Sequence, residues 1–220
     1  MTDVRTFIAD LAEHHSPFDH PFFRLPNKPT PEQLGQLYNI YQSVMHATRA
    51  GVRYVPWMDS VSQRIIIADV ILDDDRGDAH QFQLARAFEN LGAVGMWESV
   101  AFGSSSPDTD YGLLELAIDI RDHYSETLGP WVIIEVLSKQ WMIALRDALA
   151  QHFPDVVNAD YFCELSDKTH YEDAHADIAL REAEAVLSRY PDLESETREG
   201  AKSMARCLDR CWDLMAGVME

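Results

Sequence analysis

The chain has 220 residues, of which 46% are hydrophobic, and its 37 acidic and 18 basic side chains give a formal net charge of −19. This apolar content excludes a disordered chain and suits one well-buried domain, residues 1–220, which we favour over two small ones. The negative charge repels phosphate backbones and anionic membrane surfaces, so it disfavours nucleic acid and membranes as partners.

The cysteine content and the N-terminal segment indicate in which cellular compartment the protein is found. Cys163, Cys207 and Cys211 form neither an even set nor a Cys-x-x-Cys pair, which argues against a disulfide framework and a thiolate zinc site. Segment 1–15 contains acidic side chains and lacks the pattern of a signal peptide. No apolar run reaches the roughly 20 residues that a membrane-spanning helix needs. We therefore expect a cytoplasmic protein.

The first helix is expected over residues 4–15, where Phe7, Ile8 and Leu11 lie on one stripe at helical spacing. A proline-rich loop follows, over residues 16–31.

A second helix is expected to begin at Thr30 and to end near residue 49. Thr30 is the predicted N-cap, Pro31 takes the first helical position, and Gln33 lies three residues after the cap, a pattern typical of a helix start. Tyr38 and Tyr41 lie one turn apart on the inward stripe of this helix. They are either ordinary core aromatics or residues that line a pocket and take part in catalysis.

An acidic turn separates the next two predicted helices. Residues 57–74 are apolar on almost every side, which is typical of a central helix. This helix ends in successive acids that include Asp74, although carboxylates at a helix C-terminus oppose the helix dipole. His80 follows at the start of the next predicted helix, 79–91. These two residues belong either to a solvated turn or to a metal site. The apolar residues of 79–91 available for the core are Phe82, Leu84, Phe88 and Leu91.

Glu135 lies inside an unbroken apolar segment. Helices are expected over residues 113–128 and from Trp131 onward, with Gly129 and Pro130 between them. Because apolar residues flank Glu135 on both sides, no helix orientation readily takes its side chain to water, and an unpaired buried carboxylate is costly. We interpret Glu135 as paired with a cation, which is either a core Arg or Lys or a bound metal.

Four potential ligands lie within six residues before the helical run 178–189. They are His170, Glu172, Asp173 and His175. The cluster is either a solvated acidic helix face or a set of metal ligands. Carboxylates and imidazoles without thiolates suit non-haem iron or manganese, and in helical bundles such side chains project inward from several helices and hold two ions.

The last helix is expected over residues 193–218. Its predicted core stripe consists of Met204, Leu208, Cys211, Trp212 and Met215. Strand signals are missing because every β-branched run lies inside a segment of helical length. The pattern predicts an all-α fold.

Several short motifs are distributed over most of the chain. They are His20-Pro-Phe-Phe23, Thr30-Pro-Glu-Gln-Leu34, Leu72-Asp-Asp-Asp-Arg-Gly-Asp-Ala-His80, Leu91-Gly92, Glu135, Tyr161-Phe162 and Glu172-Asp-Ala-His175. In these motifs the chain resembles the haem-oxygenase-like diiron oxidase and oxygenase superfamily, whose relatives include the chlamydial death-domain-associating protein and the metal-free TenA and PqqC proteins. The resemblance implies a single-domain bundle of about seven helices.

Carried over residue by residue, the resemblance implies that Asp74, His80 and Glu135 are metal ligands, with Asp74 one methylene shorter than the usual Glu. The last ligand helix of the family reads His-x-x-x-Asp-x-x-His. Matching its end places Glu172 and His175 in register and leaves Lys168 where the first His stands in the family.

The nearest histidine to that position is His170. It lies five residues before His175, about 140° around an ideal helix, so both face one metal only through a bulge or a distorted turn. Asp173, three residues after His170, is the competing carboxylate.

The resemblance also implies two ferrous ions, or a manganese–iron pair, that activate dioxygen at open coordination positions. Substrates in the family are amino acids, amines, aminoarenes and fatty acids, and the likeness predicts a homodimer. The chlamydial-type relatives consume a tyrosine of their own chain, and Phe23 aligns at that place, which disfavours that particular activity.

Two other functions remain open. One is a metal-free TenA-like or PqqC-like enzyme with Cys163 as nucleophile, although the neighbouring Glu164 raises rather than lowers the pKa of a thiol. The other is a helical interaction protein without catalysis, in which the acidic surface recruits a basic partner.

Overall fold

The computed structural model describes residues 3–25, 27–48, 80–96, 128–162 and 169–220. Within these ranges the chain forms six α-helices and four short 3-10 helices, and no strand. The predicted all-α bundle of several helices is therefore confirmed. The helix predicted over 57–74, and all but the last residue of the one predicted over 113–128, lie outside the described residues. In the part of the chain that is described, no helix is both long and apolar enough to cross a membrane.

The α-helices are α1 (Val4–His14), α2 (Pro31–Thr48), α5 (His80–Asn90), α7 (Leu128–Ala150), α9 (Thr169–Arg189) and α10 (Glu194–Met219). The 3-10 helices are η1 (Pro17–Asp19), η2 (Pro21–Arg24), η5 (Pro154–Asn158) and η6 (Pro191–Leu193).

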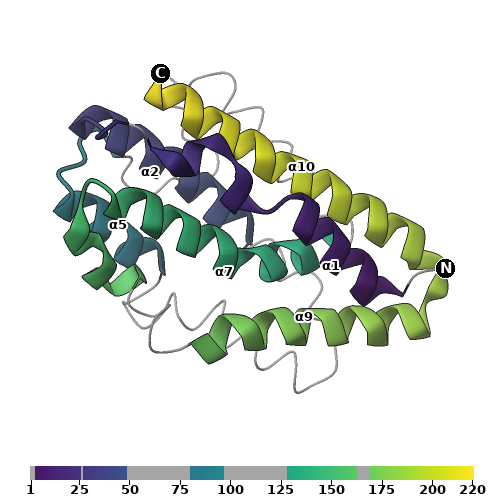
Figure 1. Ribbon diagram of the computed structural model, residues 1–220. Helices are drawn as coiled ribbons and strands as arrows, with labels where there is room; N and C mark the ends of the chain where they lie inside the picture. The colour runs from purple at the N-terminus through teal and green to yellow at the C-terminus, as the bar shows by residue number, and fades with distance from the viewer. Residues whose placement is uncertain (1–2, 26, 49–79, 97–127, 163–168) are drawn as a thin grey trace.

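Helix α7 lies in the middle of the bundle, between α10 on one side and α9 on the other (Figure 1). Its first seven residues are all buried, so it presents no solvent-facing side over that stretch. Helices α7 and α10 run in the same direction and α9 runs in the opposite direction. In agreement with this, Gly129 near the start of α7 lies against Thr197, and further along the two helices the Trp141 and Trp212 rings are 6.3 Å apart.

Gly129 allows α7 and α10 to approach closely. A Cβ atom built on this glycine would lie 1.8 Å from the carbonyl oxygen of Thr197 and 2.6 Å from the backbone nitrogen of Ala201. Both neighbours are backbone atoms of α10, which cannot move aside as a side chain can. Gly129 is therefore required by the helix contact.

Replacing Gly129 with Ala should separate α7 from α10 and lower the free energy of unfolding by about 1–3 kcal/mol, as overpacking typically does. Urea unfolding followed by circular dichroism measures the change. Gly217→Ala is the matched control, because nothing lies within 4 Å of the Cβ atom built there, and Ala favours the helix. Equal stability of the two variants would contradict the close contact.

The local signals in the sequence identified the start of α2. The Thr30 backbone N–H donates to Oε1 of Gln33 at 2.9 Å, and the Gln33 N–H donates to Oγ1 of Thr30 at 3.2 Å. This reciprocal pair is the predicted capping box. The predicted core stripe of α10 is also confirmed, since all five of its residues are buried.

Phe82 is a correction to the predicted core. Its side chain is 47% exposed, whereas Leu84 and Phe88 are fully buried. From residue 82 onward, the buried arc of α5 consists of residues 83, 84, 87 and 88, and Phe82 falls outside it because consecutive positions on a helix are 100° apart. Apolar spacing alone did not show which residues define the inward arc.

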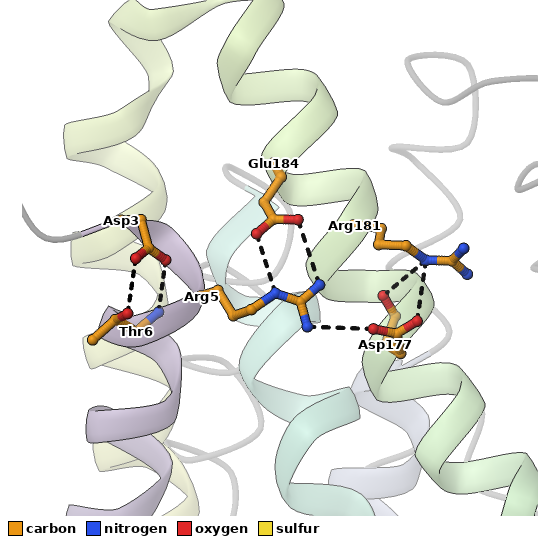
Figure 2. A network of polar contacts seen from close by, with 6 residues as sticks. All are labelled: Asp3, Arg5, Thr6, Asp177, Arg181 and Glu184. Atoms are coloured by element: carbon orange, nitrogen blue, oxygen red, sulfur yellow. Dashed lines mark hydrogen bonds and ion pairs between the residues drawn. The ribbon is translucent and has the colours of Figure 1, made fainter.

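Arg5 joins α1 to α9 at the surface (Figure 2). Its guanidinium donates to Glu184 at 3.1 and 3.4 Å and to Asp177 at 3.3 Å, and these bonds raise the pKa of Arg5. Asp3 caps the same end of α1 by accepting from the Thr6 backbone N–H at 2.9 Å, and this bond lowers the pKa of Asp3. One side chain thus bridges two acidic residues two turns apart on α9.

Substitution of Arg5 by Gln should lower the free energy of unfolding by about 1 kcal/mol or less, as is usual for exposed ion pairs. Arg181→Gln is the control, because Arg181 pairs with Asp177 inside α9 at 3.2 Å and joins no second helix among the described residues. Thermal unfolding at low salt should show a larger loss for Arg5→Gln. The difference should shrink in 1 M NaCl through screening; a loss that is unchanged by salt would contradict an ionic origin.

Candidate functional site

Glu135 lies in the first half of α7 and is half-buried. Its Oε1 atom accepts a hydrogen bond from the indole N–H of Trp131, one turn earlier, at 3.1 Å. The prediction of a carboxylate without access to water was therefore wrong. Residues 135 and 136 are both half-buried between fully buried neighbours, so α7 is more open at this point than its apolar sequence suggests.

His175 lies in α9 and is also half-buried. From residue 175 onward, the buried positions of this helix are 179, 182, 183 and 186, and they define the side that faces the bundle. His175 precedes Ala179 by four residues and so lies on the same side. Because α9 packs against α7, this side of α9 is turned toward the bundle that contains Glu135.

Helix geometry places Glu135 and His175 at a similar height along the bundle. Gly129 lies beside residues 197–201 of α10, and Glu135 is about 9 Å further along α7. Since α9 ends at residue 189 and α10 begins at residue 194 after one short turn, the two helix ends lie at the same end of the bundle. Helix α9 runs back from this shared end, antiparallel to α7. At about 1.5 Å per residue, its residue closest to the level of Glu135 is near position 178. Glu135 and His175 are thus separated by about one helical turn along the axis.

The other three residues of the cluster lie in the first turns of α9, which is a continuous α-helix from Thr169 onward. In this register Glu172 takes the position that continues the stripe of His175 and Ala179. By contrast, His170 and Asp173 take positions close to that of the exposed Asp177. The helix therefore favours Glu172 over Asp173 as the position that shares a side with His175.

The remaining predicted ligands are placed only in part. Asp74 lies outside the described residues, and His80 is the first residue of α5. Among the residues that the structure describes, no group of three or more His, Cys, Asp or Glu side chains is arranged to hold a metal ion. The complete predicted ligand set includes positions beyond that description, so it stays a prediction.

Tyr41 is in the core and forms a buried polar pair that the sequence did not predict. The hydroxyl groups of Tyr41 and Tyr161 are 3.0 Å apart, and both residues are essentially fully buried. Tyr41 also stacks at a tilt near Trp212, with ring centroids 6.4 Å apart. Tyr161 lies in one of the sequence motifs, but its partner is 120 residues away and no local pattern indicates it.

Tyr38, one turn before Tyr41, is equally part of the core. Its ring lies 5.7 Å from that of Phe88. Burial raises the pKa of Tyr38, and the charge of Glu89 raises it further, so the phenol is neutral at physiological pH. The predicted inward orientation of both tyrosines is confirmed, whereas their catalytic role stays a prediction.

The tyrosine pair can be tested with a double-mutant cycle. Tyr41→Phe and Tyr161→Phe should each lower the free energy of unfolding by about 1 kcal/mol or more, because each leaves one buried hydroxyl without this partner. The double variant should lose less than the sum of the two, since neither hydroxyl is then left behind. Urea unfolding of the four proteins measures the coupling. Additive losses would contradict a direct hydroxyl contact.

The two cysteines within the described residues, Cys207 and Cys211, do not have the surroundings of an activated nucleophile. Cys207 and Cys211 are both buried, and burial raises the pKa of Cys211 far above its ordinary value, which disfavours the reactive thiolate. Cys163, the residue that the metal-free alternative would use, lies outside the described residues.

Comparison of the chain with protein-family models, with curated proteins and with solved structures gives no match. The likeness to the diiron superfamily therefore rests on the sequence motifs.

Proposed function

We propose that the protein is a non-haem dinuclear-iron oxidase or oxygenase that uses dioxygen to oxidise a small substrate of the amino-acid, amine or fatty-acid type. The observation that supports it best is the carboxylate of Glu135 in the central helix α7, within about one helical turn of the level of His175 on the packed helix α9. Mixed carboxylate and imidazole donors of this kind suit iron, or a manganese–iron pair.

The proposed ligands come from separate helices, as in other metal-binding bundles. Glu135 would contribute from α7, and His175 and Glu172 from one side of α9. His80 at the start of α5 and Asp74 complete the set by their sequence motif. His170 and Asp173 are the alternative ligands on α9. The register of that helix favours them less, because their positions do not share the stripe of His175.

When bound, the iron supplies the redox chemistry that dioxygen activation requires. The protein contributes orientation and a controlled environment. The Trp131 indole N–H holds one oxygen of Glu135, which fixes the carboxylate rotamer in the way that outer-shell hydrogen bonds orient metal ligands. Buried neighbours on α7, Val132 and Ile134 among them, limit the access of water. Tyr38 and Tyr41 would form an aromatic wall for the substrate.

Three further features belong to the same proposal. The enzyme would act in the cytoplasm, in line with the cysteine content. It would form a homodimer, by likeness to the superfamily. Its strong negative charge would keep it from nucleic acids and anionic membranes.

The test is titration of the metal-free protein with Fe(II) under argon, followed by admission of air. The wild-type chain should bind iron and develop a transient visible absorption band. Glu135→Gln keeps the size of the side chain and removes its charge, so it should weaken iron binding by at least about tenfold. Glu184→Gln is the matched control, because Glu184 pairs with Arg5 on the outer face of α9, and it should bind iron as the wild type does.

Unchanged iron stoichiometry in Glu135→Gln would contradict the assignment of this ligand. Absence of iron uptake by the wild-type chain would contradict the whole proposal and leave the metal-free enzyme and the interaction protein as the remaining functions.

A further inference from the structure

His20 connects the backbone of η2 to α10 through both nitrogens of its ring. The Nδ1 atom accepts a hydrogen bond from the Phe22 backbone N–H at 3.2 Å, and the Nε2 atom lies 3.2 Å from Oδ1 of Asp213 on α10. Because a backbone N–H can only donate, Nδ1 is unprotonated, and the hydrogen of the neutral ring is on Nε2. This tautomer donates to the Asp213 carboxylate, so the neutral ring makes both contacts.

A proton added to His20 keeps one of these contacts and removes the other. The imidazolium ring has a hydrogen on each nitrogen, so its Nδ1 becomes a donor that faces the donating N–H of Phe22. The N-cap bond of η2 is then lost. The new charge is paired with Asp213, but this carboxylate is 74% exposed, and exposed ion pairs add little stability. The cap of η2 therefore belongs to the uncharged form of His20.

The other end of the same segment is held by contacts that acid does not remove. Leu25 is fully buried and has a φ of 29°, a backbone conformation that residues other than glycine rarely adopt. Its carbonyl oxygen is 2.7 Å from Nε2 of His152, just after α7. A carbonyl can only accept, so this Nε2 has a hydrogen both in the neutral and in the charged ring. Gln151 also donates to the Phe23 carbonyl, at 3.4 Å.

The charged groups near His20 come from its own segment and from α10. Asp19 and Arg24 lie at the two ends of the segment, and both are exposed. On α10, Asp209 lies one turn before Asp213 and pairs with His15 at 2.6 Å. The carboxylates of α10 thus contact histidine rings in two successive turns. Carboxylates ordinarily keep their charge in the pH range in which histidines change theirs.

The residues that follow His20 are part of the aromatic core. Phe22 and Phe23 are buried, and the Phe23 ring lies 5.2 Å from the ring of Trp212 on α10. We propose that His20 is an acid-sensitive anchor of segment 20–25. The neutral ring fixes the first turn of this segment against α10, and protonation releases that turn while the Leu25 end stays bound. The stabilisation is present when the ring is neutral and is lost as the pH falls.

The proposal is tested on the full-length chain without added metal. Proton–nitrogen correlation NMR spectra at about pH 8 should show the hydrogen of the His20 ring on Nε2. Amide hydrogen exchange of Phe22 is then measured at about pH 8 and about pH 5.5, between which histidines change charge. After correction for the intrinsic exchange rate, the protection of the Phe22 N–H should fall at least about tenfold at the lower pH.

Two variants separate the titration of the ring from the capping bond. Asn is a preferred N-cap residue and does not titrate, so in His20→Asn the protection of Phe22 should be about equal at both pH values. His15→Asn is the matched control. His15 contacts the Asp209 carboxylate through Nδ1, a contact that protonation does not remove, so the acid-dependent loss at Phe22 should remain in this variant.

Four results would overturn the proposal. They are a hydrogen on Nδ1 of His20 at the higher pH, equal protection of Phe22 at both pH values in the wild type, the same acid-dependent loss in His20→Asn, and a loss at the lower pH that extends through the amides of α10, which indicates general acid unfolding. If His20→Asn does not fold, the measurements on the wild-type chain decide.

Discussion

The packing of α7 in the centre of the bundle is the constraint on which the rest of the structure depends. The first seven residues of α7 are buried on all sides and need partners around them, and α1, α9 and α10 pack against this helix. The contact with α10 is so close that Gly129 is needed. Because the protein interior is close-packed, a polar side chain on such a helix has to be held by a partner or placed at an opening. Glu135 has both, with the Trp131 N–H on one oxygen and a half-buried position.

The polar groups of the core fall into two kinds. Tyr41 and Tyr161 satisfy each other, and Asn39 is satisfied by the backbone. Gln42 and Gln83 keep oxygens that nothing in the described residues satisfies. The first kind stabilises one arrangement of the helices, whereas the second has a cost in stability.

Helix α9 connects the packing with the proposed chemistry. It has one side of buried residues that continues through His175, and an outer side whose acids bind Arg5 of α1. Because the helix is regular from Thr169 onward, position 172 shares the stripe of His175 and Ala179, whereas positions 170 and 173 share that of Asp177. The outer ion pairs contribute little to stability by themselves, and they join α1 to the helix that carries the candidate ligands.

The amino-acid sequence by itself determined the helical class, the start of α2 at the Thr30 and Gln33 capping box, and the buried stripe of α10. These features depend on residues within a few turns of each other, and helical periodicity encodes them directly. Tertiary structure decided that Phe82 is exposed, that Glu135 is half-buried, and that Tyr41 bonds to Tyr161. Burial and long-range partners depend on which helices pack together, and periodicity within a single helix does not contain that information.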